Sequence, residues 1–288
     1  MTRLLLDPFR EPYMQRALVE IVVLAVLGGV VSVYVLLRRL AFMGDALTHT
    51  IFPGVAIAFV AGQSLFQGAL VFGVLAAVLL TFATRIPNVD SDAALGVLVG
   101  AFFSVGVIVV STQRAYASDL TALLFGRILT VDRGELIETA VVVVVVLAVL
   151  GLLHRPLVLL AFDPTGAEAL GYRVVLLDLA LNAAVALVVV AAARSVGTGL
   201  VIALVVVPAA TARLLVDRVG ALMAAAVGIT ALCGYVGLAA SYEASLHHGV
   251  RLGSGATIVL TLTIAFGLVA VGAASRRRLA ARSAAARR

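Results

Sequence analysis

An acidic and an imidazole side chain stand close together in an otherwise apolar part of the sequence. Asp45 and His49 lie within LRRLAFMGDALTHTIFPGVAIAF (residues 37–59), beside a long apolar run. On an α-helix, a spacing of four residues places two side chains about 40° apart around the axis and one turn above each other. A carboxylate and an imidazole are ligands that Zn²⁺, Mn²⁺ and Fe²⁺ accept. The pair is therefore a candidate metal site, and two ligands suit an ion that binds and leaves again.

The same two side chains have a structural alternative, in which they form a hydrogen-bonded pair that joins two helices. Asp178 and Asn182 repeat the four-residue spacing. Asn is a poor ligand for these metals, so hydrogen bonding between helices is the favoured role for that second pair. Glu20 is expected to extend to the outer surface with its apolar stem buried.

A third group of candidate ligands occurs near the C-terminal end of the sequence. Glu243, His247 and His248 lie in SYEASLHHGVRLG (residues 241–253), and together they are a possible outer metal contact. Adjacent residues point to different sides of a regular element. An ordinary polar loop is therefore the favoured interpretation of this segment.

The composition excludes a water-soluble domain. The 288 residues are 63% hydrophobic and 12% charged, with a mean hydropathy of +1.17. A soluble domain is nearer half apolar and a quarter charged, so the solvent for this chain is a lipid bilayer. We predict an all-α membrane protein with about nine transmembrane helices, eight being the alternative, because runs of this length must satisfy their own backbone hydrogen bonds in lipid. The expected spans are 17–37, 42–61, 65–84, 93–112, 135–153, 174–193, 197–212, 219–240 and 255–274.

Two of these spans contain proline. The run 42–61 contains Pro53, and the run 197–212 contains Pro208, so both are expected to be kinked or broken. Residues 1–275 form one predicted transmembrane domain, and residues 276–288 form a basic tail. Two loops are predicted to contain short helices, one within 113–134 and one within 163–172.

The arginines indicate an orientation in the membrane. All 21 basic residues are Arg, and six of them lie in the C-terminal segment 275–288. If that segment is cytoplasmic and nine spans are present, the inner loops hold 13 Arg and the outer loops hold 8. The N-terminus is then outside. A basic tail after a series of spans favours binding to anionic lipid over binding to nucleic acid.

Some activities are excluded by missing residues. A nucleotide-binding P-loop requires a Lys, and this chain has none, so any ATP chemistry must come from another subunit. The single cysteine, Cys233, cannot form an internal disulfide. Neither G-x-S-x-G nor H-E-x-x-H occurs, and we therefore do not expect an enzyme.

Five segments resemble one family in the same order along residues 12–275. They are RRLAFMGDALTHTIFPGVAIAF (38–59), LLFGRILTVDRGEL (123–136), FDPTGAEALGY (162–172), VGTGLVIALVVVPAATARLL (196–215) and SYEASLHHGVRLGSGATIVL (241–260). Each is similar to a segment of the permease subunits of zinc, manganese and iron ABC importers. The resemblance implies the type II importer permease fold in a bacterial cytoplasmic membrane.

The resemblance also implies roles and partners. Asp45 and His49 correspond to residues that line the metal pathway, with Zn²⁺, Mn²⁺ or Fe²⁺ as the transported ion and no permanently bound cofactor. The implied partners are two ATP-binding subunits, a second permease copy, an extracytoplasmic metal-binding protein and membrane lipid. The segment 163–172 corresponds to the coupling helix that docks on the ATPase. Its implied contact residues are Asp163, Gly166, Ala167, Glu168, Ala169, Leu170 and Gly171.

Three other functions remain open from the sequence. A permease for a metal chelate such as a siderophore or cobalamin is expected to have a wide pathway with more aromatic residues than the 6% found. A proton-coupled secondary carrier would use Asp45 and Asp178 as proton sites and would need no ATPase. A non-transporting membrane scaffold would keep Asp45 away from any aqueous path.

Overall fold

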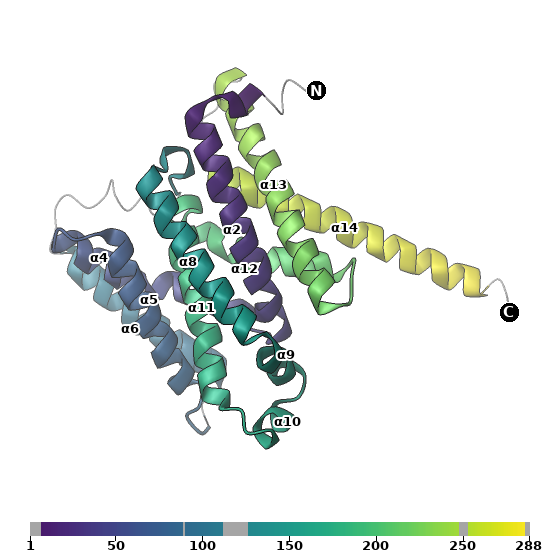
Figure 1. Ribbon diagram of the computed structural model, residues 1–288, viewed down its shortest axis with the longest axis horizontal. Coiled ribbons are helices and arrows are strands. Elements are labelled where there is room, and N and C mark those ends of the chain that lie inside the picture. Colours follow the sequence, from purple (N-terminus) through teal and green to yellow (C-terminus); the bar gives the residue numbers. More distant parts are fainter. Residues whose placement is uncertain (1–6, 89, 112–125, 248–252, 286–288) are drawn as a thin grey trace.

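The computed structural model describes residues 7–88, 90–111, 126–247 and 253–285, and helices account for all the regular structure in those ranges (Figure 1). This agrees with the rule that a chain in lipid must satisfy its backbone hydrogen bonds within each segment. Two 3₁₀ helices, η1 (Asp7–Arg10) and η2 (Ile128–Thr130), accompany the α-helices. The α-helices are α2 (Pro12–Leu37), α3 (Ala41–Thr50), α4 (Phe52–Val60), α5 (Leu65–Ala83), α6 (Ser91–Ser111), α8 (Arg133–Leu152), α9 (His154–Phe162), α10 (Pro164–Ala169), α11 (Val174–Val196), α12 (Thr198–Arg213), α13 (Val219–His247) and α14 (Ser254–Ala285).

Eight segments of the described chain are long and apolar enough to cross a membrane, with α3 and α4 together forming one of them. The ninth apolar helix, α12, is shorter, at 16 residues or about 24 Å. Ser195, just before α12, contacts Glu20 of α2, and Ala212 near its other end packs with Val33 of α2. The helix α12 therefore runs beside α2, but length and composition support eight spans in the described chain, which was the alternative count.

Proline breaks one of the two spans in which it occurs. The span predicted at 42–61 is divided at Ile51 into α3 and α4, and Pro53 lies in the first turn of α4. Proline at that position has no N–H to donate, and its ring excludes the carbonyl of the preceding turn. Pro208 lies inside α12, which is nevertheless assigned as one helix.

Close backbone contact fixes α4 against α5. A Cβ atom added to Gly54 would meet the carbonyl oxygen of Gly68, and one added to Gly68 would meet the carbonyl oxygen of Gly54. Helices in membranes pack closely where small residues face each other. The two glycines therefore hold the break after α3 in place, and with it the orientation of α3.

The centre of the bundle is formed by α2, α11 and α12, with α8 alongside them and α14 extending away toward the C-terminus (Figure 1). More than half of the residues of α2 and of α11 are buried. The short helix α10 lies at the end of the bundle opposite the start of α2 (Figure 1).

The expectation for Glu20 was wrong. Its side chain is fully buried, and one carboxylate oxygen accepts hydrogen bonds from Ser195 (2.6 Å) and Thr139 (3.0 Å). The donors come from α11 and α8, which cover α2 at this level. Nothing near Glu20 in the sequence indicates those neighbours, because they lie more than 100 residues away along the chain.

Helices extend further than expected in three places, two predicted loops and the predicted C-terminal tail. The helix α9 occupies much of the region between the spans predicted at 135–153 and 174–193, in addition to the short helix α10. The segment 241–253 is helical as far as His247, so its interpretation as a polar loop was wrong for that part. The helix α14 continues through the predicted tail to Ala285. Most of the short helix expected within 113–134 lies outside the described residues.

Replacing Gly54 by Ala tests the packing of α4 on α5. The added methyl group meets backbone, which cannot rotate away, and we expect a loss of about 1–3 kcal/mol in unfolding free energy. Gly228→Ala is the matched control, because a Cβ there meets nothing within 4 Å. Thermal unfolding in detergent measures both variants. Equal melting temperatures for the two would contradict the close contact.

Candidate metal site

The helix α3 presents two different faces. Met43 and Leu47 are buried, at 2% and 1% exposure, on the side that packs against α11 and α12. Asp45 and His49 lie on the side that faces α6. Because residues three and four apart share a helix face, the sequence itself separates the packing side from the side that carries the ionisable pair.

The two side chains meet as the four-residue spacing predicts. His49 Nε2 lies 3.6 Å from Asp45 Oδ1, and about half of each side chain is exposed, 48% for His49 and 47% for Asp45. That distance is too long for a good hydrogen bond. Two ligand atoms that each lie about 2.1 Å from one ion are roughly 3.0–3.4 Å apart for bond angles between octahedral and tetrahedral. A small rotation of either side chain would therefore let both bind the same ion.

The pair opens onto a cavity of about 420 Å³ between α3 and α6. Two carboxylates and one imidazole contribute to its wall, and none of the described lining residues is Arg or Lys. This charge distribution favours a cation. The lining residues are Phe42, Asp45, Ala46, His49, Asp92, Leu95, Gly96 and Val99.

Asp92 was not identified from the sequence. It lies in the first turn of α6, where an acidic residue is ordinary because it interacts well with the helix dipole. No spacing in the sequence connects it with Asp45, which is 47 residues away in the numbering. Only the packing of α6 against α3 brings both carboxylates to one cavity.

The other candidate ligands do not add to this site. Among the described residues, no three His, Cys, Asp or Glu side chains lie close enough to hold one metal ion. Glu243 lies on α13, whereas His248 lies outside the described residues, so the outer contact of Glu243, His247 and His248 stays a prediction.

Asp178 has a structural role. Its two carboxylate oxygens accept hydrogen bonds from Arg38 (2.6 Å) and Arg85 (2.7 Å), and Arg38 also donates to the Leu160 carbonyl (3.0 Å). These contacts join α2, α9 and α11 with the segment after α5. Asn182 donates to Thr81 (2.8 Å), which confirms the predicted hydrogen bonding between helices.

The short helix predicted within 163–172 is present as α10. The Asp163 carboxylate accepts hydrogen bonds from the Gly166 N–H (2.8 Å) and the Thr165 hydroxyl (2.9 Å), and these bonds lower the pKa of Asp163 below its ordinary value. Ala167 is buried, whereas Leu170 is 71% exposed. Leu170 directly follows the six-residue helix as its C-cap, and its exposed side chain at the end of the bundle is available to a partner protein.

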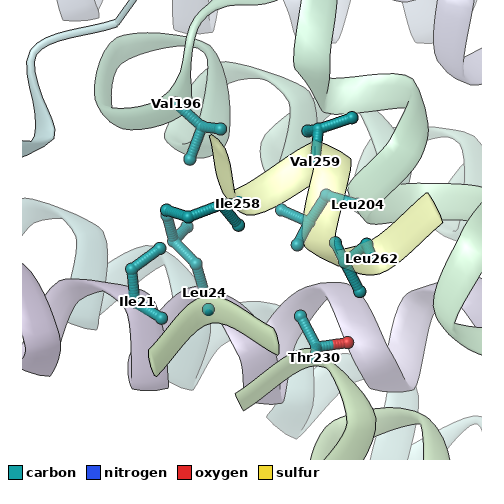
Figure 2. A pocket seen from close by; sticks show the side chains of 9 residues that line it. Ile21, Leu24, Val196, Leu204, Thr230, Ile258, Val259 and Leu262 are labelled. Atoms are coloured by element: carbon teal, nitrogen blue, oxygen red, sulfur yellow. The ribbon is translucent and has the colours of Figure 1, made fainter. Parts of the chain in front are cut away.

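A second cavity is too small and too apolar to be a site (Figure 2). It holds about 10 Å³, close to the minimum for one water molecule. Among the lining side chains in Figure 2, only Thr230 carries an oxygen, and its hydroxyl already donates to the Ala226 carbonyl (2.8 Å). This cavity is a packing gap between α2, α11, α12, α13 and α14.

A bundle of candidate membrane spans with an ionisable pair at a cavity between two of them is the arrangement expected of a membrane permease. The sequence pattern of the ABC 3 transport family matches residues 10–273, and this chain belongs to that family.

Two curated relatives, both membrane proteins of metal transport systems, agree with this assignment. The chain is 36% identical over 254 residues to the manganese import system permease protein ScaB of Streptococcus parasanguinis, covering 88% of each chain. It is 33% identical over 242 residues to the chelated iron transport system membrane protein YfeC of Yersinia pestis, covering 84% of this chain and 82% of that one.

Solved structures show the same fold. The structure of PsaBC from Streptococcus pneumoniae in complex with Fab matches with a TM-score of 0.80 and 30% identity, covering 93% of this chain and 95% of that one. An inward-facing conformation of a putative metal-chelate type ABC transporter matches with a TM-score of 0.69 and 19% identity, covering 89% and 85%. The second match supports the fold alone.

Asp178→Asn tests the ion cluster that Asp178 forms with Arg38 and Arg85 near α10. Hydrogen bonds to charged groups are worth about 1.5–3 kcal/mol, and we expect a loss of unfolding free energy in that range. Asp217→Asn is the control, because Asp217 is 92% exposed and its pairing with Arg213 is worth at most about 1 kcal/mol. Denaturation in detergent micelles compares the two. A cluster that contributes little would leave Asp178→Asn as stable as the control.

Proposed function

We propose that this chain is the membrane-spanning permease subunit of an ATP-driven importer of divalent transition-metal ions. The observation that carries the proposal is the Asp45–His49 pair, whose side chains lie 3.6 Å apart at a cavity without Arg or Lys in its described wall. Membership of the ABC 3 transport family and the names of the relatives support the same function.

The ion is proposed to pass through this cavity as a substrate and to contact the pair in transit. Two ligands leave most of a four- to six-coordinate shell to water or to other groups, so the ion is held loosely enough to leave. A second copy of the permease is one source of further ligands, because about half of each side chain is exposed. The names of the relatives favour Mn²⁺ and iron, although Asp and His also suit Zn²⁺.

The energy is proposed to come from separate ATPase subunits. This chain contains no Lys and therefore no P-loop. The helix α10 is the proposed docking site, with two ATPase copies in the assembly. Closure of the ATPases on ATP would displace α10, and the bundle would alternate between outward- and inward-facing states around the level of Asp45 and His49.

The remaining partners follow from the direction of transport. An extracytoplasmic binding protein would deliver the metal at the end of the bundle away from α10. The proposed location is the bacterial cytoplasmic membrane, with the C-terminus inside and the N-terminus outside.

One alternative is less well supported by the geometry. A proton-coupled carrier would need Asp178 as a proton site, but both of its oxygens accept hydrogen bonds from arginines. A chelate permease remains the second candidate, because the name of YfeC refers to chelated iron. Comparing uptake of free iron and of siderophore-bound iron by the same cells distinguishes a permease for metal chelates from a permease for metal ions.

Asp45→Asn and His49→Ala test the metal contact. Each change removes one of two ligands, and we expect initial uptake of ⁵⁴Mn²⁺ to fall at least about tenfold in cells that depend on this importer. The control Asp217→Asn removes an exposed carboxylate that does not line the cavity, and it should transport normally. Wild-type uptake by both site variants, at equal amounts of permease in the membrane, would exclude the assigned contact.

Leu170→Asp tests the docking of α10. A charge in place of an exposed leucine should weaken an apolar contact by about 1.5–3 kcal/mol, which lowers co-purification of the ATPase with the permease. Leu215→Asp is the control, because Leu215 is also exposed (56%) but lies after α12 and outside α10. Equal ATPase recovery with both variants would argue against α10 as the docking site.

A further inference from the structure

We propose that Asp92 is the next contact for the transported cation, on the α10 side of the Asp45–His49 pair, and that it receives the ion as it leaves. The inference rests on the proposed metal-import function and adds a release residue to it. It follows from the shared cavity, from the order of the three side chains along that cavity, and from the charge of its wall.

The cavity is lined by matching faces of two helices. The lining residues of each helix are spaced by three, one and three positions. On α3 they are Phe42, Asp45, Ala46 and His49, and on α6 they are Asp92, Leu95, Gly96 and Val99. Each set is therefore a single helix face. The α3 set contains Asp45 and His49, and the α6 set begins with Asp92.

Aromatic contacts fix the level of α6 relative to α3. The ring of Phe103 lies edge-on to His49 at 6.2 Å and stacks on Phe52 at 5.5 Å. Gly106 also packs against Phe52. Phe103 is therefore level with His49 and Phe52, and α3 and α6 point in the same direction.

The rise per residue then places Asp92 beyond Asp45. Asp92 precedes Phe103 by 11 residues, or about 16 Å along α6, whereas Asp45 precedes His49 by four residues, or about 6 Å along α3. Asp45 precedes Phe52, the other partner of Phe103, by seven residues or about 10 Å. The two carboxylates are thus about 6–10 Å apart along the cavity, in agreement with the finding that no three described ligands hold one ion. Asp92 is therefore a separate contact for the ion, and it does not bind the ion together with Asp45 and His49.

Asp92 lies at the end of the bundle that carries α10. Arg85, in the segment leading to α6, donates to Asp178 (2.7 Å). Asp178 lies in the first turns of α11, which directly follows α10. An ion that moves from the pair toward the proposed ATPase side must therefore pass the level of Asp92.

The cavity suits a hydrated cation. Six water molecules occupy roughly 180 Å³ at about 30 Å³ each, well within the 420 Å³ available. An exposed carboxylate at the end of such a path lowers the energy of a departing divalent ion without enclosing it, which is the condition for fast release. Asp92 also stabilises the N-terminus of α6 through its dipole, and the experiment must separate the two roles.

The experiment uses the permease with its ATPase in vesicles and ⁵⁴Mn²⁺ as the probe, with rates divided by the amount of folded permease. Asp92→Asn should lower the maximal transport rate at least about tenfold, with KM changed by less than about twofold. Asp92→Ser should show the same loss, because serine favours a helix N-terminus but carries no charge. Asp92→Glu should restore most of the rate.

The control is Asp90→Asn, because Asp90 is an exposed carboxylate two residues away that does not line the cavity. It should transport like the wild type. A normal rate for Asp92→Asn or for Asp92→Ser overturns the proposal, and so does an equal loss in Asp90→Asn. If Asp45→Asn abolishes transport while Asp92→Asn does not, the proposed function stands and only the release role fails.

Discussion

The cost of placing an ionisable group in a membrane governs this structure. Such groups must be paired, hydrogen-bonded, hydrated or bound to an ion. Glu20 is buried and hydrogen-bonded by two hydroxyls, and Asp178 is held by two arginines. Asp45 and His49 differ from both, because about half of each side chain is exposed to a cavity and their mutual contact is long. The groups that hold the bundle together are thus distinguishable from the groups that are free to bind an ion.

Polar contacts at its two ends hold α11 in the bundle. At one end Ser195 binds Glu20, and Arg194 pairs with Glu138 (2.6 Å) while its guanidinium lies over the Phe66 ring. At the other end Asp178 pairs with Arg38 and Arg85. Between these ends α11 is almost entirely apolar and buried. In the proposed mechanism, α11 is therefore the helix that links the α10 end of the bundle to its far end.

The sequence was sufficient for the features that depend on local pattern. Long apolar runs located the spans, Pro53 located the break before α4, and the four-residue spacing brought Asp45 and His49 together. It was insufficient where distant segments decide the outcome. The burial of Glu20 depends on donors from α8 and α11, and the role of Asp92 depends on how α6 packs against α3. Spacing along one helix is visible in a sequence, but spacing between two helices is not.

A short covalent path connects the ion cluster to the candidate site. Arg38 binds Asp178 and the Leu160 carbonyl of α9, the helix that leads into α10. Arg39 follows with a positive φ of 57°, which turns the chain sharply, and α3 begins two residues later at Ala41. Movement of α9 and α10 relative to α2 must therefore strain the contacts of Arg38, together with the hydrogen bond between Tyr34 of α2 and His154 of α9 (2.7 Å). Because α3 starts so close to Arg38, the position of the Asp45–His49 face depends on the same contacts.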